Sequence, residues 1–204
     1  MSLTRHIPRL AAALAFFLSV AAWTPSHGAV IITATETAGN VVFSFTGSVI
    51  LTGLTGGPDS GPVPAELVPT AGYFSNYGSS GAYSQDEYSA TITGTAFGTG
   101  GPTGIASSSG GSRLVFSGSS IIFDVGYTSG APLSGSMTFN SETFTTLGVT
   151  PGSYVYEIKD GSNNVVDTIT MNIGAGAVPE PSRALLAGLG LGGLLLRRRR
   201  AAKA

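Results

Sequence analysis

Between residues 30 and 177, apolar and polar side chains alternate in short runs that glycine, serine and proline interrupt. An alternation with a period of two residues places the apolar side chains on one face of a β-strand, and such interruptions are typical of turns. Sustained apolar spacing at three to four residues, which an amphipathic helix needs, does not occur in this stretch. The pattern predicts an all-β fold, an antiparallel β-sandwich of about eight short strands. The predicted strands cover residues 30–35, 40–51, 88–97, 113–116, 120–125, 134–139, 153–159 and 164–173.

Three connecting segments carry local signals of their own. Pro151 and Gly152 predict a turn over residues 150–153, in which Gly152 takes a positive φ. Residues 159–164 predict the hairpin connection between the last two strands. The four prolines within residues 53–70 predict an extended, non-helical crossover.

The charged side chains are distributed unevenly along the chain. Residues 29–177, called the body below, contain two basic side chains, Arg113 and Lys159, and ten acidic ones, which gives a formal charge of −8. A body this acidic repels phosphate backbones and anionic lipids, so we expect no nucleic acid among its partners. The chain contains 0 Cys, so its core rather than disulfides must stabilise the fold.

Residues 1–28 have the organisation of a secretory signal peptide, which would form a signal helix. A basic start is followed by an apolar run over residues 10–23, which is shorter than a membrane span needs. Ser26 and Gly28 are small enough for the positions before a cleavage site, so we expect cleavage after Gly28. Cleavage after Ala29 and a retained N-terminal anchor are the alternatives.

Residues 178–204 combine three features in a fixed order. Pro179-Glu180-Pro181 comes first, an uncharged apolar run over residues 184–196 follows, and Arg197-Arg198-Arg199-Arg200 comes directly after it. A helix over that run would be about 20 Å long, whereas the hydrocarbon core of a bilayer is about 30 Å thick. The predicted apolar helix is therefore a short membrane span. The arginine cluster would stay on the cytoplasmic side and stop translocation, which leaves the body outside the inner membrane.

The order of these features resembles the PEP-CTERM sorting tail of Gram-negative bacteria that make extracellular polysaccharide. The resemblance implies that a membrane protease, exosortase, recognises Pro179, Glu180 and Pro181 and then releases or transfers the protein. The tail would accordingly hold the protein at the inner membrane only transiently, before it reaches the cell surface or the extracellular space. This tail departs from the family pattern in being short and rich in glycine.

Residues 72–88 hold several aromatic side chains among glycines and serines. Rigid rings among small, adaptable residues are typical of recognition surfaces, so this segment is a candidate contact loop. Its candidate contact residues are Tyr73, Phe74, Tyr77 and Tyr83. The alternative is that these rings pack over a sheet edge, because aromatic side chains usually become buried.

Residues that commonly carry out catalysis are missing from the predicted body. It has no cysteine or histidine, since His6 and His27 lie in the predicted signal peptide. It therefore lacks the means for a Ser-His-Asp triad, a histidine or cysteine zinc site, or a thiol nucleophile. No catalytic residue, metal ligand or cofactor is predicted.

Carboxylates are the remaining side chains of the body that could take part in catalysis or bind a metal ion. Asp86 and Glu87 are adjacent, and adjacent side chains of a strand face opposite sides, which disfavours a catalytic pair. The segment that begins at Asp160 has no glycine at its sixth position and no glutamate at its twelfth, which disfavours an EF-hand calcium loop. Calcium binding elsewhere is a hypothesis that rests on charge density alone. Its candidate ligands are Asp59, Asp86, Glu87 and Asp124.

These observations predict an exported, non-enzymatic cell-surface or extracellular-matrix protein that is sorted through its tail. Its expected partners are the membrane, an exosortase-type protease, and exopolysaccharide or other matrix components. One alternative is a secreted polysaccharide-binding module, in which tyrosine rings stack on sugars. The other is a secreted hydrolase that uses two carboxylates. Glycan binding would favour the first, and activity lost on substitution of one Asp or Glu would favour the second.

Overall fold

A computed structural model describes residues 28–59, 61, 64–78 and 85–174 of the chain. These residues form strands in two sheets and a single 3-10 turn, η2 (Pro69–Ala71). The strands are β1 (Ala29–Thr37), β2 (Asn40–Gly47), β3 (Thr55–Asp59), β4 (Glu66–Val68), β5 (Tyr73–Asn76), β6 (Gln85–Ser89), β7 (Thr91–Thr93), β8 (Ser108–Gly111), β9 (Leu114–Phe116), β10 (Ser120–Asp124), β11 (Leu133–Asn140), β12 (Gly152–Lys159) and β13 (Val165–Ile173). The predicted all-β fold is confirmed for this part of the chain. The predicted signal helix and the predicted apolar tail helix lie outside the described residues.

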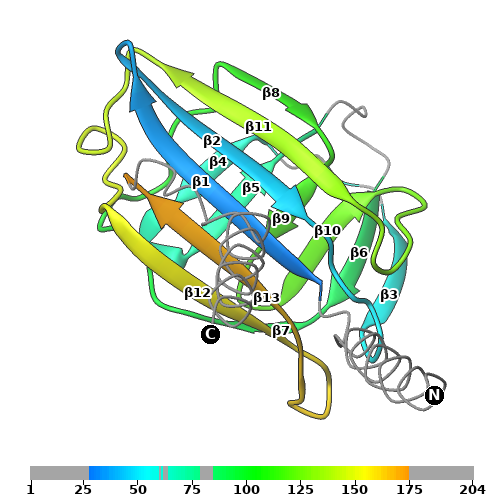
Figure 1. Cartoon of the computed structure of the whole chain (residues 1–204). Helices are drawn as coiled ribbons and strands as arrows, with labels where there is room; N and C mark the ends of the chain where they lie inside the picture. The colour runs from blue at the N-terminus through cyan, green and yellow to red at the C-terminus, as the bar shows by residue number, and fades with distance from the viewer. Residues whose placement is uncertain (1–27, 60, 62–63, 79–84, 175–204) are drawn as a thin grey trace, which may run out of the picture.

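The two sheets differ in their strand order. The first sheet has the order β7-β12-β13-β1-β2-β11-β8, and the second has the order β3-β6-β10-β9-β5-β4 (Figure 1). All neighbouring pairs are antiparallel except β1 and β13, which run parallel from the pair Ala29 and Thr168 to the pair Ala34 and Ile173. The prediction of antiparallel sheets therefore holds with this one exception. It arises because the first and last strands lie side by side in the middle of the first sheet.

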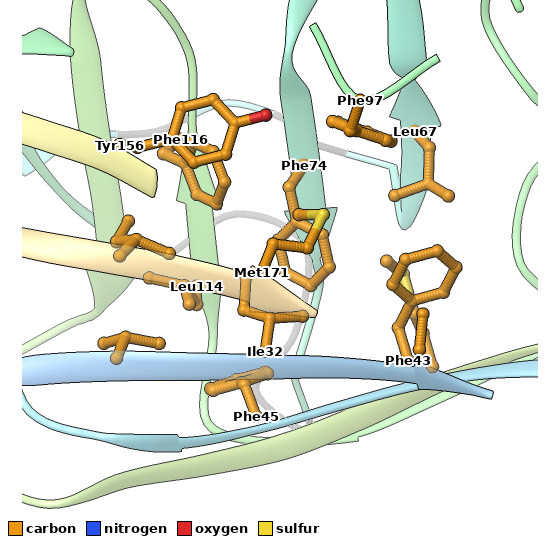
Figure 2. Packing of buried hydrophobic residues seen from close by; sticks show 14 of the residues in the cluster. Ile32, Phe43, Phe45, Leu67, Phe74, Phe97, Leu114, Phe116, Tyr156 and Met171 are labelled. Carbon is orange, nitrogen blue, oxygen red and sulfur yellow. The ribbon is translucent and has the colours of Figure 1, made fainter. Parts of the chain in front are cut away.

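One hydrophobic core fills the space between the two sheets. The period of two residues turns alternate side chains of β1, β2 and β13 inward, and these side chains are almost fully buried. Phe74 of the second sheet lies against Phe43 and Phe45 of the first, with ring centroids 6.1 Å and 6.3 Å apart (Figure 2). Tilted and edge-to-face ring pairs of this kind add about 1 kcal/mol each beyond the burial of apolar area. The described fold thus rests on aromatic and aliphatic packing, in a chain with 0 Cys.

The number of strands is larger than the sequence pattern predicted. Thirteen strands are described instead of about eight, and the segment predicted as a crossover contains β3 and β4. Gly56, Gly57 and Pro58 make β3 a poor strand by propensity, but β3 is an edge strand, where proline is tolerated. A Cβ atom at Gly56 would lie 2.0 Å from the carbonyl oxygen of Glu87, so glycine allows β3 to approach β6.

The two turn predictions near the last strands have different outcomes. The hairpin between β12 and β13 is confirmed, and Asp160 closes it by accepting hydrogen bonds from the backbone N–H groups of Ser162 (2.9 Å) and Asn164 (2.8 Å). The prediction of a positive φ at Gly152 is wrong, because Gly152 is the extended first residue of β12. The positive φ that this part of the chain requires lies at Gly148 (φ 66°).

No helix among the described residues is both long enough and apolar enough to cross a membrane.

Candidate functional site

Three of the four aromatic residues of the predicted contact loop are described, and these three do not form one surface. Tyr73 and Phe74 belong to β5, Tyr77 follows that strand, and Tyr83 lies outside the described residues. Phe74 is 0% exposed, and its ring stacks on Phe116 with centroids 5.6 Å apart. The prediction of a contact role is therefore wrong for Phe74, because the alternation of β5 turns it into the core. Tyr73 and Tyr77 are half-buried.

Next to Tyr77 lies Arg113, whose side chain is fully buried. Its Nε donates to the carbonyl oxygen of Tyr77 (3.3 Å), and its Nη1 donates to Oε1 of Gln85 (3.2 Å). The guanidinium carbon lies 5.1 Å from the centroid of the Tyr77 ring, which is a cation–π distance. Burial of a charge is costly unless hydrogen bonds compensate for it, so these contacts explain how Arg113 is accommodated.

The polar contacts around Arg113 connect several strands. Gln85 begins β6, and its Nε2 donates to Oδ2 of Asp59 at the end of β3 (3.2 Å). Asp124, the last residue of β10, accepts a hydrogen bond from the backbone N–H of Arg113 (2.8 Å). Asn76 at the end of β5 donates through Nδ2 to the carbonyl oxygens of Gly110 (3.3 Å) and Ser112 (2.8 Å). These contacts cross-link one end of the second sheet and fix the position of Tyr77.

Tyr77 lines one side of a groove with a volume of about 410 Å³. The groove is mainly apolar, with three serines along one side. Its lining residues are Pro64, Ala65, Tyr77, Ile105, Ala106, Ser107, Ser108 and Ser109. Ile105 is 73% exposed, which is the largest exposure among the large hydrophobic side chains of the described residues. An exposed aliphatic side chain beside an aromatic ring is a feature of binding surfaces rather than of cores.

Backbone hydrogen bonds hold the two walls of the groove together. The N–H of Ala106 donates to the carbonyl oxygen of Ala65 (2.7 Å), and the N–H of Thr103 donates to that of Leu67 (2.8 Å). Leu67 in turn donates its N–H to the hydroxyl of Thr103 (3.0 Å). The segment that carries Ile105 is thus attached along β4, while Arg113 holds Tyr77 opposite it. These hydrogen bonds hold the backbone that lines the groove in place.

Sequence reasoning identified one residue of this groove, Tyr77, and missed the others. Ile105 lies between two glycine-rich stretches, where no regular alternation of apolar and polar residues predicts a strand or a helix. Arg113 and its partner Gln85 are 28 residues apart in the chain. An isolated apolar residue in a glycine-rich loop was the one available signal for Ile105, since such a residue is either buried by tertiary contacts or used for binding.

Of the carboxylates that were candidates for calcium binding, Asp59 and Asp124 flank Gln85 on neighbouring strands of the second sheet. Asp86 and Glu87 are consecutive residues of β6, opposite Phe123 and Ile122 of β10, and their side chains therefore face opposite sides. Asp86 accepts a hydrogen bond from the N–H of Gly126 (2.9 Å). Within the described ranges, no group of three or more His, Cys, Asp or Glu side chains could hold a metal ion. The calcium hypothesis stays a prediction without a geometric basis.

Pro179, Glu180, Pro181 and Arg197 to Arg200 lie outside the described residues. Comparisons with known proteins give no further assignment: no family model matches the chain, and no curated protein or solved structure matches it.

Proposed function

We propose that this chain is an exported, non-enzymatic protein of the cell surface or extracellular matrix, sorted by an exosortase-type protease that acts on its tail. In this proposal the body is a β-sandwich between a signal helix, residues 1–28, and a short apolar helix in residues 178–204. The signal peptide is removed first. The tail then holds the body at the inner membrane until the protease cuts near Pro179, and the body is displayed outside the cell.

The observation that carries the proposal is the order of features in the tail. Pro179-Glu180-Pro181 precedes an apolar run of 13 residues, and the arginine cluster follows that run at once. Each feature alone is common, but the ordered combination has a physical logic: a site for recognition, a marginal membrane span and a stop to translocation. A span of about 20 Å is a poor permanent anchor, which suits a temporary hold.

The composition of the body supports the proposal. Its described strands, from Ala29 to Ile173, lie within the residues that the proposal assigns to the body. Its core contains no cysteine, so the body does not depend on disulfide formation after export. Its formal charge of −8 favours solubility and opposes attachment to anionic lipid.

Replacement of the recognition residues tests the proposal. In a host that carries an exosortase-type protease, we expect the native chain to appear outside the inner membrane with a C-terminus near Pro179, as read by mass spectrometry. A variant with alanine at Pro179, Glu180 and Pro181 should keep its Arg197–Ala204 end and stay in the inner-membrane fraction. Alanine at the flanking Val178 and Ser182 is the matched control, which should be delivered normally. Delivery of the triple variant at the native level would refute the proposal.

A second candidate function, polysaccharide binding by the body, is favoured by the groove. Tyr77 and Ile105 offer an aromatic and an aliphatic surface for the apolar face of a sugar ring, and Ser107 to Ser109 offer hydroxyls for its polar edges. We expect Ile105→Ser to weaken binding to the producing strain's exopolysaccharide at least about fivefold, which is about 1 kcal/mol. Because Ile105 is 73% exposed, the substitution should leave the fold intact.

The matched control for this test lies near the edge of the first sheet opposite to β8, whose Ser108 and Ser109 line the groove. Val155 on β12 is also an exposed hydrophobic residue, at 53% exposure, and it does not line the groove. Val155→Ser should bind the polysaccharide as the native protein does in a pull-down or titration. Equal binding by the native chain and Ile105→Ser, at matched melting temperatures, would exclude the groove as the polysaccharide site.

A further inference from the structure

A second, smaller pocket lies where the chain crosses from the second sheet to the first. β6 of the second sheet ends at Ser89 and β7 of the first sheet begins at Thr91, with Ala90 between them. The pocket at this crossing has a volume of about 270 Å³, and Asp160 contributes a carboxylate to its lining. Four further lining residues are exposed and carry hydroxyl groups. They are Thr55, Ser89, Thr91 and Ser119.

Backbone pairing holds the walls of this crossing pocket together. The N–H of Ala90 donates to the carbonyl oxygen of Ser119 (3.1 Å), which attaches the turn between β9 and β10 to the crossing. On the other side, Thr91 pairs with Lys159 of β12, the residue before Asp160. The hydroxyl groups and the carboxylate are therefore carried by backbone segments that are bonded to one another.

The carboxylate of Asp160 is held in place by the hairpin that it closes. Its Oδ1 accepts hydrogen bonds from the N–H groups of Ser162 (2.9 Å) and Asn164 (2.8 Å), and its Oδ2 accepts one from Nδ2 of Asn164 (3.0 Å). The side chain of Asn164, followed by its backbone N–H, holds the pKa of Asp160 below its ordinary value of 3.8, so the carboxylate is ionised at neutral pH. These donors are uncharged, and a carboxylate has about four lone-pair sites, so Asp160 can accept a further hydrogen bond from a ligand.

One ionised carboxylate among several hydroxyl groups selects the chemistry of a ligand. A calcium ion prefers six or more oxygen ligands, usually with several carboxylates, whereas the side chains of this pocket include one carboxylate. The side chain of a lysine would pair with Asp160 but would place methylene groups against the hydroxyls. We propose that the crossing pocket binds an amino sugar with a free, protonated amine. The ammonium group lies against Asp160, and the sugar hydroxyls bond to the hydroxyl groups of the lining.

The inference goes beyond the proposed function, because it concerns a different surface and a different charge. The crossing pocket shares no lining residue with the groove beside Tyr77, and the side chains that line that groove are uncharged. Neither the processing of the tail nor binding in the groove is required. The formal charge of −8 on the body attracts cationic sugars to its surface, and Asp160 then fixes the position of one amine.

Two matched oligosaccharides test the inference without any substitution. Glucosamine oligomers carry protonated amines, and N-acetylglucosamine oligomers of the same length carry neutral amides at the same positions. In calorimetric titrations of the full chain in detergent, at mildly acidic pH, we expect the glucosamine oligomer to bind at least about threefold more tightly. This preference should shrink as salt is added, because salt screens an exposed ion pair. Equal affinities for the two oligomers, or no binding of either, would overturn the inference.

One substitution assigns the preference to the pocket. Asp160→Asn removes the charge but keeps an oxygen for the N–H groups of Ser162 and Asn164, so the hairpin should form and the preference for the amine should be lost. Glu142→Gln is the matched control, since it changes the net charge by the same amount at a residue that does not line the pocket, and it should keep the preference. A preference that survives Asp160→Asn, or that Glu142→Gln reduces equally, would indicate a general attraction by the acidic body and would refute the site.

Discussion

At the scale of single residues, Arg113 stands out because its charged side chain is buried and needs hydrogen bonds to compensate for the loss of water. It is one of two basic residues in the body and, among the described residues, the largest side chain that is fully buried. Its contacts with Tyr77 and Gln85 join the end of β5 to β6, and through Gln85 to β3. Removal of one member of such a network leaves the other polar groups buried without their partners, which costs more than the loss of a surface contact.

The two basic residues of the body allow a direct comparison. We expect Arg113→Ala to lower the free energy of unfolding by about 3 kcal/mol or more in urea titrations. Lys159→Ala should change it by less than about 1 kcal/mol, because the pair with Glu157 is partly exposed (3.0 Å). Similar losses for the two variants would contradict the role assigned to the Arg113 contacts.

The buried hydroxyl of Tyr156 makes the stability of the fold depend on pH in the alkaline range. Its hydroxyl donates to the carbonyl oxygen of Thr95 (2.9 Å), and burial, followed by the neighbouring Tyr154, raises its pKa well above the ordinary value of 10.0. The neutral ring therefore stabilises the fold at all pH values below about 10, and this contribution is lost as the pH rises further. Tyr156→Phe should cost about 1 kcal/mol at pH 7. Above pH 10 the difference from the native protein should shrink in urea titrations, and a constant difference would argue against the assignment.

At the scale of strands, Gly47 sets how closely three strands approach. It ends β2, where it pairs with Val30 of β1 and with Leu133 of β11, and its φ is +142°. A Cβ atom there would lie 2.0 Å from the carbonyl oxygen of Ala29, which is backbone and cannot move aside. Glycine at this position therefore allows β2 to approach the start of β1 closely.

An alanine comparison tests this role of glycine. Gly47→Ala should lower the free energy of unfolding by about 2 kcal/mol or more, because both the backbone conformation and the space disfavour a side chain. Gly161→Ala is the control, since nothing lies within 4 Å of a Cβ atom there. It should change stability by less than about 0.5 kcal/mol in the same urea titration. A tolerated Gly47→Ala would mean that β1 and β2 can separate locally at little cost.

Strands with a clear apolar pattern were predicted, the short β9 and β10 included, whereas the glycine-rich β3 and β8 were missed, for a physical reason. β1, β2, β11, β12 and β13 each bury one face, so their residues alternate, and all five were predicted near their observed positions. β3 and β8 are edge strands rich in glycine, and tertiary pairing rather than propensity makes them strands. Tyr77 and Ile105 line the groove, and Arg113 contacts Tyr77. These three residues are far apart in the chain and leave no local pattern.

At the scale of the whole molecule, the first sheet is incomplete until the last strand is available. β13 lies between β12 and β1, and it contributes Ile169, Met171 and Ile173 to the core. The pairing of β1 with β13 spans nearly the entire body, and contacts this distant in sequence form slowly. Folding of the body is therefore expected to follow its complete translocation.

Two truncations test the importance of the last strand. A chain that ends at Gly174 keeps every described strand, and its melting temperature should match that of the full chain within about 1 °C. A chain that ends at Asp160 lacks β13 and should show no cooperative unfolding in thermal circular dichroism. A cooperative transition in the shorter chain would mean that the remaining strands form an independent unit.

The parallel pairing of β1 with β13 has a mechanical consequence. Both strands run in the same direction, so the chain enters the sheet at one end of the pair and leaves it at the other. A pull on the two chain ends acts in opposite directions along the two neighbouring strands and loads the hydrogen bonds of all six residue pairs together. Bonds under such shear must break in one step, whereas the strands of a hairpin can be unzipped one bond at a time. A body tethered through one chain end and pulled through the other would therefore resist tension.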